Sequence, residues 1–171
     1  MPIISEETIK ALNVQLNEEH FSSNLYFNMA GWASKNGLPG ASAFLNMHAK
    51  EEHEHLELFS NFIKKVGGQP VMSAMQEPVS SFESIEDIFN KILQHEKYIT
   101  SCIKKLVNKA MEDKDYITLK FLDWFIDEQV EEEELFSSII DKIKILGELK
   151  GRDLYMFDEY LASLASASKE E

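Results

Sequence analysis

The chain has 171 residues, a length typical of one domain. It carries 30 acidic and 17 basic side chains, so its formal net charge is −13. Proteins that bind nucleic acid or dock on anionic lipid present basic surfaces, and we therefore expect neither partner. Apolar residues make up 44% of the chain, enough for one sizeable core, so the acidity does not indicate disorder.

Cysteine content and hydropathy bear on the compartment. The one cysteine, Cys102, excludes an intrachain disulfide and favours a reducing compartment. The first residues show neither the basic nor the apolar region of a signal peptide. No stretch approaches the ~18 uncharged apolar residues that a membrane span needs. We therefore expect a cytoplasmic protein with no membrane partner.

Apolar residues recur with helical spacing along most of the chain, and no segment shows the alternation of a strand. Five helices are predicted, at about 6–35, 41–66, 85–111, 116–146 and 152–165. Ser5 and Ser84 stand where N-caps of the first and third helices are needed. Glu86 and Asp87 follow Ser84, where carboxylates favour the positive end of the helix dipole.

The connections predict how the helices are arranged. At ~1.5 Å per residue, each of the four long helices spans ~40–45 Å, and three of the four connections are short enough to join antiparallel neighbours. The stretch at 67–82 is long, and ~15 extended residues at ~3.3 Å each reach the whole length of such a bundle. We therefore predict an all-α fold over 1–171, a single domain built as a four-helix bundle with one long crossover and a short C-terminal helix.

Each long helix has a potential metal ligand in the middle of its apolar face. In chain order these are Glu19, Glu52 with His55, Glu96, and Gln129 with Glu132. Residues three apart share one face of a helix, so each pair points the same way. Carboxylates that converge in an apolar core repel one another and resist burial, and a di- or trivalent cation removes both penalties. Hard cations favour oxygen ligands and iron also accepts imidazole, so the pattern predicts a site for a di- or trivalent cation, for which iron is suitable.

These positions match the ligand pattern of ferritin-like di-iron proteins, in which two helices each supply a Glu and two supply Glu-x-x-His. The fit covers three helices, because Gln129 and Glu132 replace the second Glu-x-x-His. Over nearly its whole length the sequence resembles the bacterial non-haem ferritins, of which this departure is characteristic. The resemblance rests on four stretches, at 16–26, 44–55, 95–96 and 121–136.

The resemblance implies a ferroxidase centre in each subunit. Three residues match the ligands of the first iron, namely Glu19, Glu52 and His55. Three match those of the second, namely Glu52 as a bridge, Glu96 and Glu132. Gln129 would lie close by, and Tyr26, seven residues after Glu19, matches the family's tyrosine beside the centre. The expected reaction is oxidation of Fe(II) by O2 or peroxide, with ferric mineral deposited in a shell cavity.

The resemblance carries three further expectations. A third iron site matches Glu51, Glu128, Glu131 and Glu132. Haem is not expected, because haem-binding relatives use an interface methionine and the second Glu-x-x-His that this chain lacks. The family assembles as a homo-oligomeric shell of 24 subunits, with the fifth helix at the four-fold axes.

Two other classes remain open from the residues alone. One is a rubrerythrin-like di-iron peroxidase or oxidase without a storage shell, although a single cysteine excludes the rubredoxin-like cysteine pair usual in that class. The other is a metal-free structural bundle, which leaves the buried polar positions unexplained. Four histidines fall outside the ligand pattern and are interpreted as surface residues or as neighbours of the centre, namely His20, His48, His53 and His95.

Overall fold

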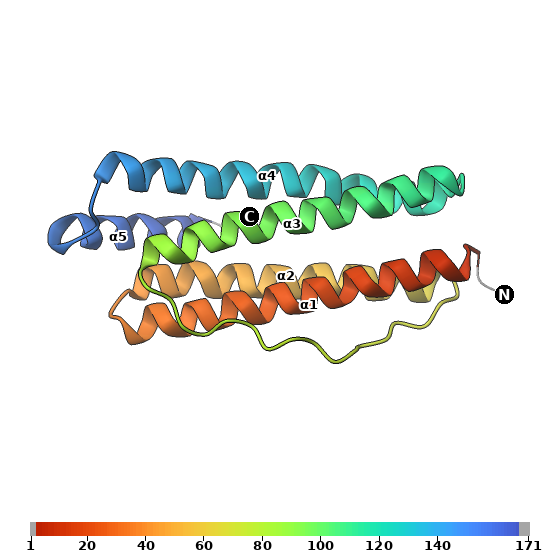
Figure 1. Ribbon diagram of the computed structural model, residues 1–171, viewed down its shortest axis with the longest axis horizontal. Coiled ribbons are helices and arrows are strands. Elements are labelled where there is room, and N and C mark those ends of the chain that lie inside the picture. The colour runs from red at the N-terminus through yellow and green to blue at the C-terminus, as the bar shows by residue number, and fades with distance from the viewer. Residues whose placement is uncertain (1–2, 168–171) are drawn as a thin grey trace.

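The computed structural model describes residues 3–167, and within them it contains five helices and no strand (Figure 1). The helices are α1 (Glu6–Lys35), α2 (Pro39–Lys65), α3 (Ile85–Glu112), α4 (Tyr116–Leu146) and α5 (Gly151–Ala167). The predicted all-α bundle with a short last helix is confirmed. The largest differences are at the start of α2 and the end of α5. Helix α2 begins at Pro39 rather than at 41, because a proline at the first helical position needs no amide hydrogen bond.

Side-chain caps set the starts of three long helices. The Ser5 hydroxyl accepts a hydrogen bond from the Thr8 amide at 3.0 Å, and the Ser84 hydroxyl accepts one from the Asp87 amide at 3.1 Å. Both predicted caps are therefore confirmed. The start of α4 is capped in the same way by Asp115.

The long crossover between α2 and α3 runs along the bundle beside α1, so that α2 and α3 are parallel (Figure 1). Asparagines one turn apart on α1 hold it in place. Asn13 accepts a hydrogen bond from the Val71 amide at 2.7 Å, and Asn17 accepts one from the Ser73 amide at 2.8 Å. Further along α1, the Asn28 amide donates to the backbone carbonyl of Pro78. These bonds satisfy backbone groups of a segment that has no secondary structure of its own.

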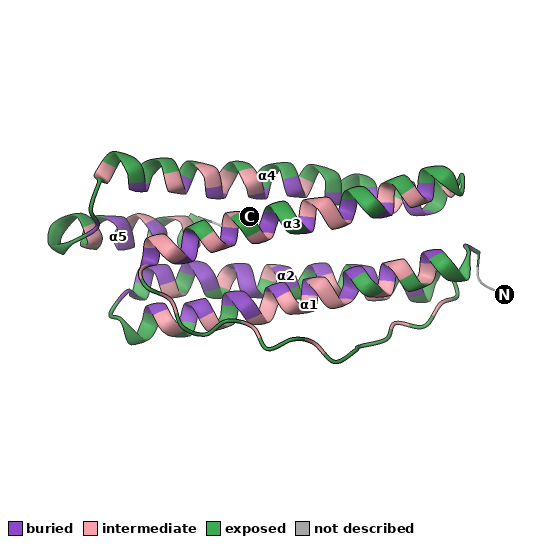
Figure 2. Cartoon of the chain, viewed as in Figure 1, coloured by how far each residue is buried: buried purple, intermediate pink, exposed green. Residues whose placement is uncertain are grey.

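The apolar core forms two blocks, and a polar layer lies between them along every long helix. Buried residues gather on the inward faces of the helices (Figure 2). On α1 the first block ends at Leu16 and the second resumes at Leu25, with Glu19 between them. On α4 the blocks end at Phe125 and Phe136, again with polar residues between. The middle of the bundle is therefore the part of the core that is lined by polar side chains.

Helix α5 docks on the start of α2. The Asp158 carboxylate accepts hydrogen bonds from the amides of Gly40, at 2.9 Å, and Ala41, at 2.7 Å. Amides at a helix start are unpaired and favour negative charge, so the buried Asp158 is compensated there. A side chain at Gly40 would put a Cβ 2.0 Å from the Asp158 carbonyl oxygen, so only glycine allows this approach.

None of the described helices is long and apolar enough to cross a bilayer.

Candidate metal centre

All six residues predicted from the mid-helix pattern are buried in the middle of the bundle. Each is at most 5% exposed, namely Glu19, Glu52, His55, Glu96, Gln129 and Glu132. We call these six residues the polar tier. They come from four helices and interrupt the apolar stripe of each, as expected for ligands that converge on one point. Burying so many carboxyl groups is costly unless they are protonated or neutralised by a cation.

Glu19, Glu52 and His55 form one cluster of potential ligand atoms, all within 4.8 Å of one another. The His55 Nδ1 atom lies 3.3 Å from an oxygen of Glu52 and 3.9 Å from an oxygen of Glu19. With metal–ligand bonds of ~2.0–2.2 Å, neighbouring ligand atoms lie ~3–3.6 Å apart, so the spacing suits a shared cation. Gln15 donates a 2.7 Å hydrogen bond to Glu19 and fixes its orientation.

Glu96 is held differently, by hydrogen bonds to two neighbours. The Tyr26 hydroxyl donates to its Oε1 atom at 2.5 Å, and the Gln129 amide donates to its Oε2 atom at 3.2 Å. Gln129 also contacts the Thr100 hydroxyl at 3.2 Å. Glu96 belongs to none of the clusters of three potential ligand atoms among residues 3–167. The second predicted ligand set consists of Glu52, Glu96 and Glu132. All three residues are buried in the tier, but their ligand atoms do not form a compact cluster.

In the absence of a cation, the buried environment favours the protonated form of carboxyl groups in the polar tier. Burial, reinforced by the other carboxyl groups, raises the pKa of Glu19 and Glu52 well above the ordinary range. Burial and then the neighbouring Glu96 raise the pKa of Glu132 to about 9. Burial and the same Glu96 also raise the pKa of Tyr26 well above its usual value. A bound cation reverses this preference, because it stabilises the charged form that burial disfavours.

The residues predicted to form a third iron site line a cavity of about 340 Å³ that opens beside the tier. Two clusters of potential ligand atoms involve these residues, and each of them contains a histidine. One cluster consists of His48, Glu51 and Glu132, and the other of Glu51, His55 and Glu128. Glu131 is exposed, lines the same cavity and belongs to none of these clusters. The all-carboxylate third site therefore stays a prediction.

His48 is a buried neighbour of the polar tier, which is one of the two positions expected for it from the sequence. It is 2% exposed, and neither ring nitrogen has a hydrogen-bond partner. Its Nδ1 atom faces Glu51 and Glu132, while its ring packs against Phe44 and Phe136 at centroid distances of 4.5 and 5.1 Å. Its place on the buried stripe of α2, one turn before Glu52, is the sequence signal for this position.

The other three histidines also lie at the surface or beside the centre. His53 is exposed, and His20 is only partly buried. His95 is partly buried, and its Nε2 atom lies 2.7 Å from the Ser22 hydroxyl oxygen. Burial lowers the pKa of His95 to about 4, so its ring is neutral at physiological pH.

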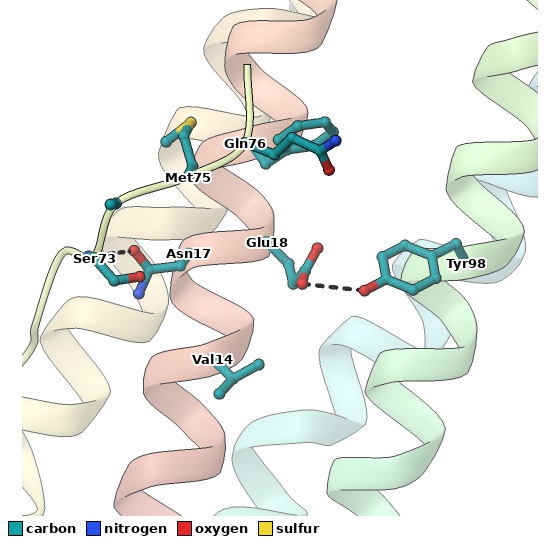
Figure 3. A pocket seen from close by; sticks show the side chains of 9 residues that line it. Val14, Asn17, Glu18, Ser73, Met75, Gln76 and Tyr98 are labelled. Carbon is teal, nitrogen blue, oxygen red and sulfur yellow. Dashed lines mark hydrogen bonds between the residues drawn. The ribbon is translucent and has the colours of Figure 1, made fainter. Parts of the chain in front are cut away.

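A second cavity, of about 440 Å³, lies between α1, α3 and the crossover (Figure 3). The Tyr98 hydroxyl donates a 3.1 Å hydrogen bond to Glu18 across it, and Asn17 holds the crossover at Ser73. Glu18 is the one carboxylate among the described residues that line this cavity. The cavity therefore lacks the convergent ligands that distinguish the polar tier.

Comparisons with known proteins show the family to which this fold belongs. Residues 9–146 match the ferritin family model, described as a ferritin-like domain. The chain is 40% identical over 167 residues to a bacterial non-heme ferritin of Campylobacter jejuni, covering 98% of this chain and 99% of the relative. It is 41% identical over 164 residues to a probable bacterial non-heme ferritin-like protein of Haemophilus influenzae, covering 96% and 99%. The crystal structure of an open pore ferritin from Archaeoglobus fulgidus superposes with a TM-score of 0.91 at 36% identity, covering 95% and 98% of the two chains. The chain therefore belongs to the ferritin family, among relatives named bacterial non-heme ferritins.

Proposed function

We propose that this protein is an iron-storage ferritin whose polar tier is a ferroxidase centre. The observation that carries the proposal is the tier itself, in which four buried carboxyl groups and one imidazole converge from four helices. Two bound ferrous ions would neutralise the negative charge of the ionised carboxylates. Iron is then substrate and cargo, and the protein's part is to bind a pair of ions, admit the oxidant and let the product leave.

The proposed ligand sets use the tier as the sequence predicted. Glu19, Glu52 and His55 bind the first ion, and their spacing already suits one. Glu52, Glu96 and Glu132 bind the second, with Glu52 shared between the two. Each Fe(II) gives up one electron, and the oxidant, O2 or peroxide, accepts the pair. Protons displaced from the tier when the ions bind are lost to solvent, because the bound carboxylates must be deprotonated.

Gln129 and Tyr26 tune the second position. A neutral amide binds metal more weakly than an imidazole, so we expect Gln129 to favour release of the ferric product towards a mineral core. Tyr26 orients Glu96 through its hydroxyl, which keeps this ligand in place while the tier is empty of cations.

The family relationship supports an assembly of 24 subunits, with a hollow shell for storage. The lone Cys102 is compatible with a reducing compartment, and we place the shell in the cytoplasm.

Particle mass and iron oxidation together test this proposal. A shell of 24 chains of 19.7 kDa each has a mass of about 470 kDa. We expect such a particle, and we expect it to oxidise Fe(II) in air and to take up many irons per subunit. Glu52→Gln should abolish the fast oxidation, because it removes the shared ligand. His53→Ala is the matched control, since His53 is exposed and lies one residue away on α2.

Two results would contradict the proposal. A particle of two chains that holds only two irons per chain would indicate a rubrerythrin-like di-iron enzyme instead. Oxidation that is equally fast in Glu52→Gln and in the wild-type chain would show that the polar tier is not the reaction site.

A further inference from the structure

Two polar residues beside the polar tier, Thr100 on α3 and Glu133 on α4, belong to neither of the ligand sets described above. Each lies one helical turn after a member of the tier, Thr100 after Glu96 and Glu133 after Gln129. Both are partly buried, and a hydrogen bond joins their side chains. The pair therefore lies at the edge of the tier, within reach of the Gln129 amide.

The nitrogen of the Gln129 amide is held by three acceptors on α3. Its Nε2 atom lies 3.2 Å from the Oε2 atom of Glu96, 3.3 Å from the backbone carbonyl oxygen of Glu96 and 3.2 Å from the hydroxyl oxygen of Thr100. Within residues 3–167, the hydrogen bonds of this amide all involve its nitrogen. The amide thus presents its nitrogen to α3 and keeps its oxygen free.

The direction of the amide follows from the single proton of the Thr100 hydroxyl. This hydroxyl donates a 2.6 Å hydrogen bond to the Oε1 atom of Glu133. A carboxylate only accepts, so the hydroxyl proton is committed to Glu133 and the hydroxyl oxygen can only accept from Gln129. A reversed amide would place two oxygen atoms about 3.2 Å apart with no proton between them. Glu133 therefore fixes the direction of the Gln129 amide through Thr100.

The two acceptors on Glu96 are less suited to this task. Its backbone carbonyl lies inside α3, where it already accepts a helical hydrogen bond. Its Oε2 atom belongs to a carboxyl group that binds the second ion in the proposed function, and an ion there weakens the group as an acceptor. Thr100 is the acceptor of the three that carries neither commitment.

We propose that Thr100 and Glu133 are positioning residues for the second ion of the polar tier. They hold the nitrogen of the Gln129 amide against α3, so that the amide oxygen is the end available to a cation. Hard cations accept amide oxygen, whereas a reversed amide would present N–H groups that a cation repels. The identity of the ion as iron rests on the proposed function, and the effect on cation binding is testable without it.

Cobalt is a suitable probe, because Co2+ accepts the oxygen and nitrogen ligands that suit Fe2+. Anomalous diffraction from crystals of the assembled protein, soaked in a series of Co2+ concentrations, gives the occupancy of each tier position. Thr100→Val removes the hydroxyl and keeps the shape of the side chain. The position at Glu96 should then need about two- to tenfold more Co2+ for half occupancy, the factor that one hydrogen bond is worth. The position at Glu19 and His55 should be unchanged.

Further variants test whether the effect runs through the amide. Thr100→Ser keeps the hydroxyl and should restore the wild-type occupancy. Glu133→Leu frees the hydroxyl proton to point at Gln129, so it should weaken the second position in the same direction. Glu134→Leu, at an exposed position on the same helix, is its control and should match the wild type. In Gln129→Leu, which has no amide to hold, Thr100→Val should bring no further loss.

Three results would overturn the inference. One is wild-type cobalt occupancy in Thr100→Val. Another is an equal loss at both tier positions, which would mean that Thr100 is needed only for packing. The third is a further loss when Thr100→Val is added to Gln129→Leu. Failure of the proposed function gives a different result, namely a wild type that binds cobalt at both positions, with the expected loss in Thr100→Val, but does not oxidise Fe(II).

Discussion

The Tyr26 hydroxyl donates a 2.5 Å hydrogen bond to the Glu96 carboxyl group, and both residues are fully buried. This bond joins α1 to α3 across the centre of the bundle. It orients a carboxyl group that would otherwise lack a donor on that oxygen. The same hydrogen bond therefore contributes to the stability of the fold and to the orientation of a residue in the candidate iron site.

Tyr26→Phe should therefore destabilise the metal-free protein. Loss of the hydroxyl leaves a buried carboxyl oxygen unpaired, which costs ~1–3 kcal/mol per chain. Thermal or denaturant unfolding of the metal-free protein measures this loss. Tyr155→Phe is the control, because Tyr155 is exposed on α5 and its change should stay within ~0.5 kcal/mol. Equal stabilities of the two variants would mean that the Tyr26 bond contributes nothing.

Cation binding by the polar tier should release protons. Burial and the neighbouring Glu96 raise the pKa of Glu132 to about 9, so this group keeps its proton at pH 7 in the absence of a cation. A metal ion must displace that proton, and its affinity should rise as the pH rises from 6 towards 9. Calorimetry in buffers of different ionisation enthalpy counts the protons. Glu132→Gln should release fewer protons per ion, whereas Glu134→Gln, at an exposed position on the same helix, should match the wild type.

The same shift predicts how stability depends on pH without metal. The folded-state pKa of Glu132, about 9, is higher than the ordinary value of 4.5. Between these two values the folded chain holds more protons than the unfolded chain, so stability should fall as the pH rises. Melting temperatures of metal-free protein from pH 5 to pH 9 measure the slope, which should be shallower in Glu132→Gln. A melting temperature that rises over this interval, or a slope identical in the variant, would contradict the assignment.

Gly40→Ala should dislodge α5 from the start of α2. The added Cβ would lie 2.0 Å from the Asp158 carbonyl oxygen, so one helix must move. Such overpacking costs ~1–3 kcal/mol. If α5 sits at an assembly axis, as the family relationship implies, the fraction of intact shells in size-exclusion chromatography should also fall.

Gly31→Ala is the matched control for this change. Gly31 lies inside α1, and its Cβ would meet no atom within 4 Å. Alanine there should raise stability by ~0.5–1 kcal/mol, because glycine is the poorer helix former. A Gly40→Ala protein as stable and as fully assembled as Gly31→Ala would show that the contact with Asp158 is not needed.

Gln129→His tests whether the amide favours product release. The substitution restores an imidazole ligand and removes the hydrogen bond from the Gln129 amide to Glu96. We expect the first round of Fe(II) oxidation to persist and later rounds to slow several-fold, because the ferric product is held more tightly. Stopped-flow absorbance after repeated additions of Fe(II) measures both. Unchanged kinetics over successive additions would count against this role.

The fold was largely predictable because its signals are local and strong. Helical periodicity, the caps Ser5 and Ser84 and the length of the crossover all indicate the same bundle, and the helices follow them closely. The path of the crossover over α1 was not predictable. It depends on Asn13 and Asn17, whose side chains could equally have faced solvent. Only the packed structure shows which backbone groups they meet.

The candidate site was predictable to the extent that a polar residue on an apolar stripe is unusual. Glu19 and Glu96 stand out in this way, since each interrupts a run of core residues. For His48 the sequence left two positions open, at the surface or beside the centre. Its place depends on the carboxylate of Glu132, which is far away in the sequence and comes close only when α4 packs against α2.

The central claim is that the polar tier binds a pair of iron ions, and anomalous diffraction at the iron edge tests it most directly. Crystals soaked with Fe(II) under anaerobic conditions should show two iron peaks in the polar tier of each chain. One should be bound by Glu19, Glu52 and His55, and the other by Glu52, Glu96 and Glu132. A tier that stays free of iron, or that holds a single ion at saturating Fe(II), would contradict this account.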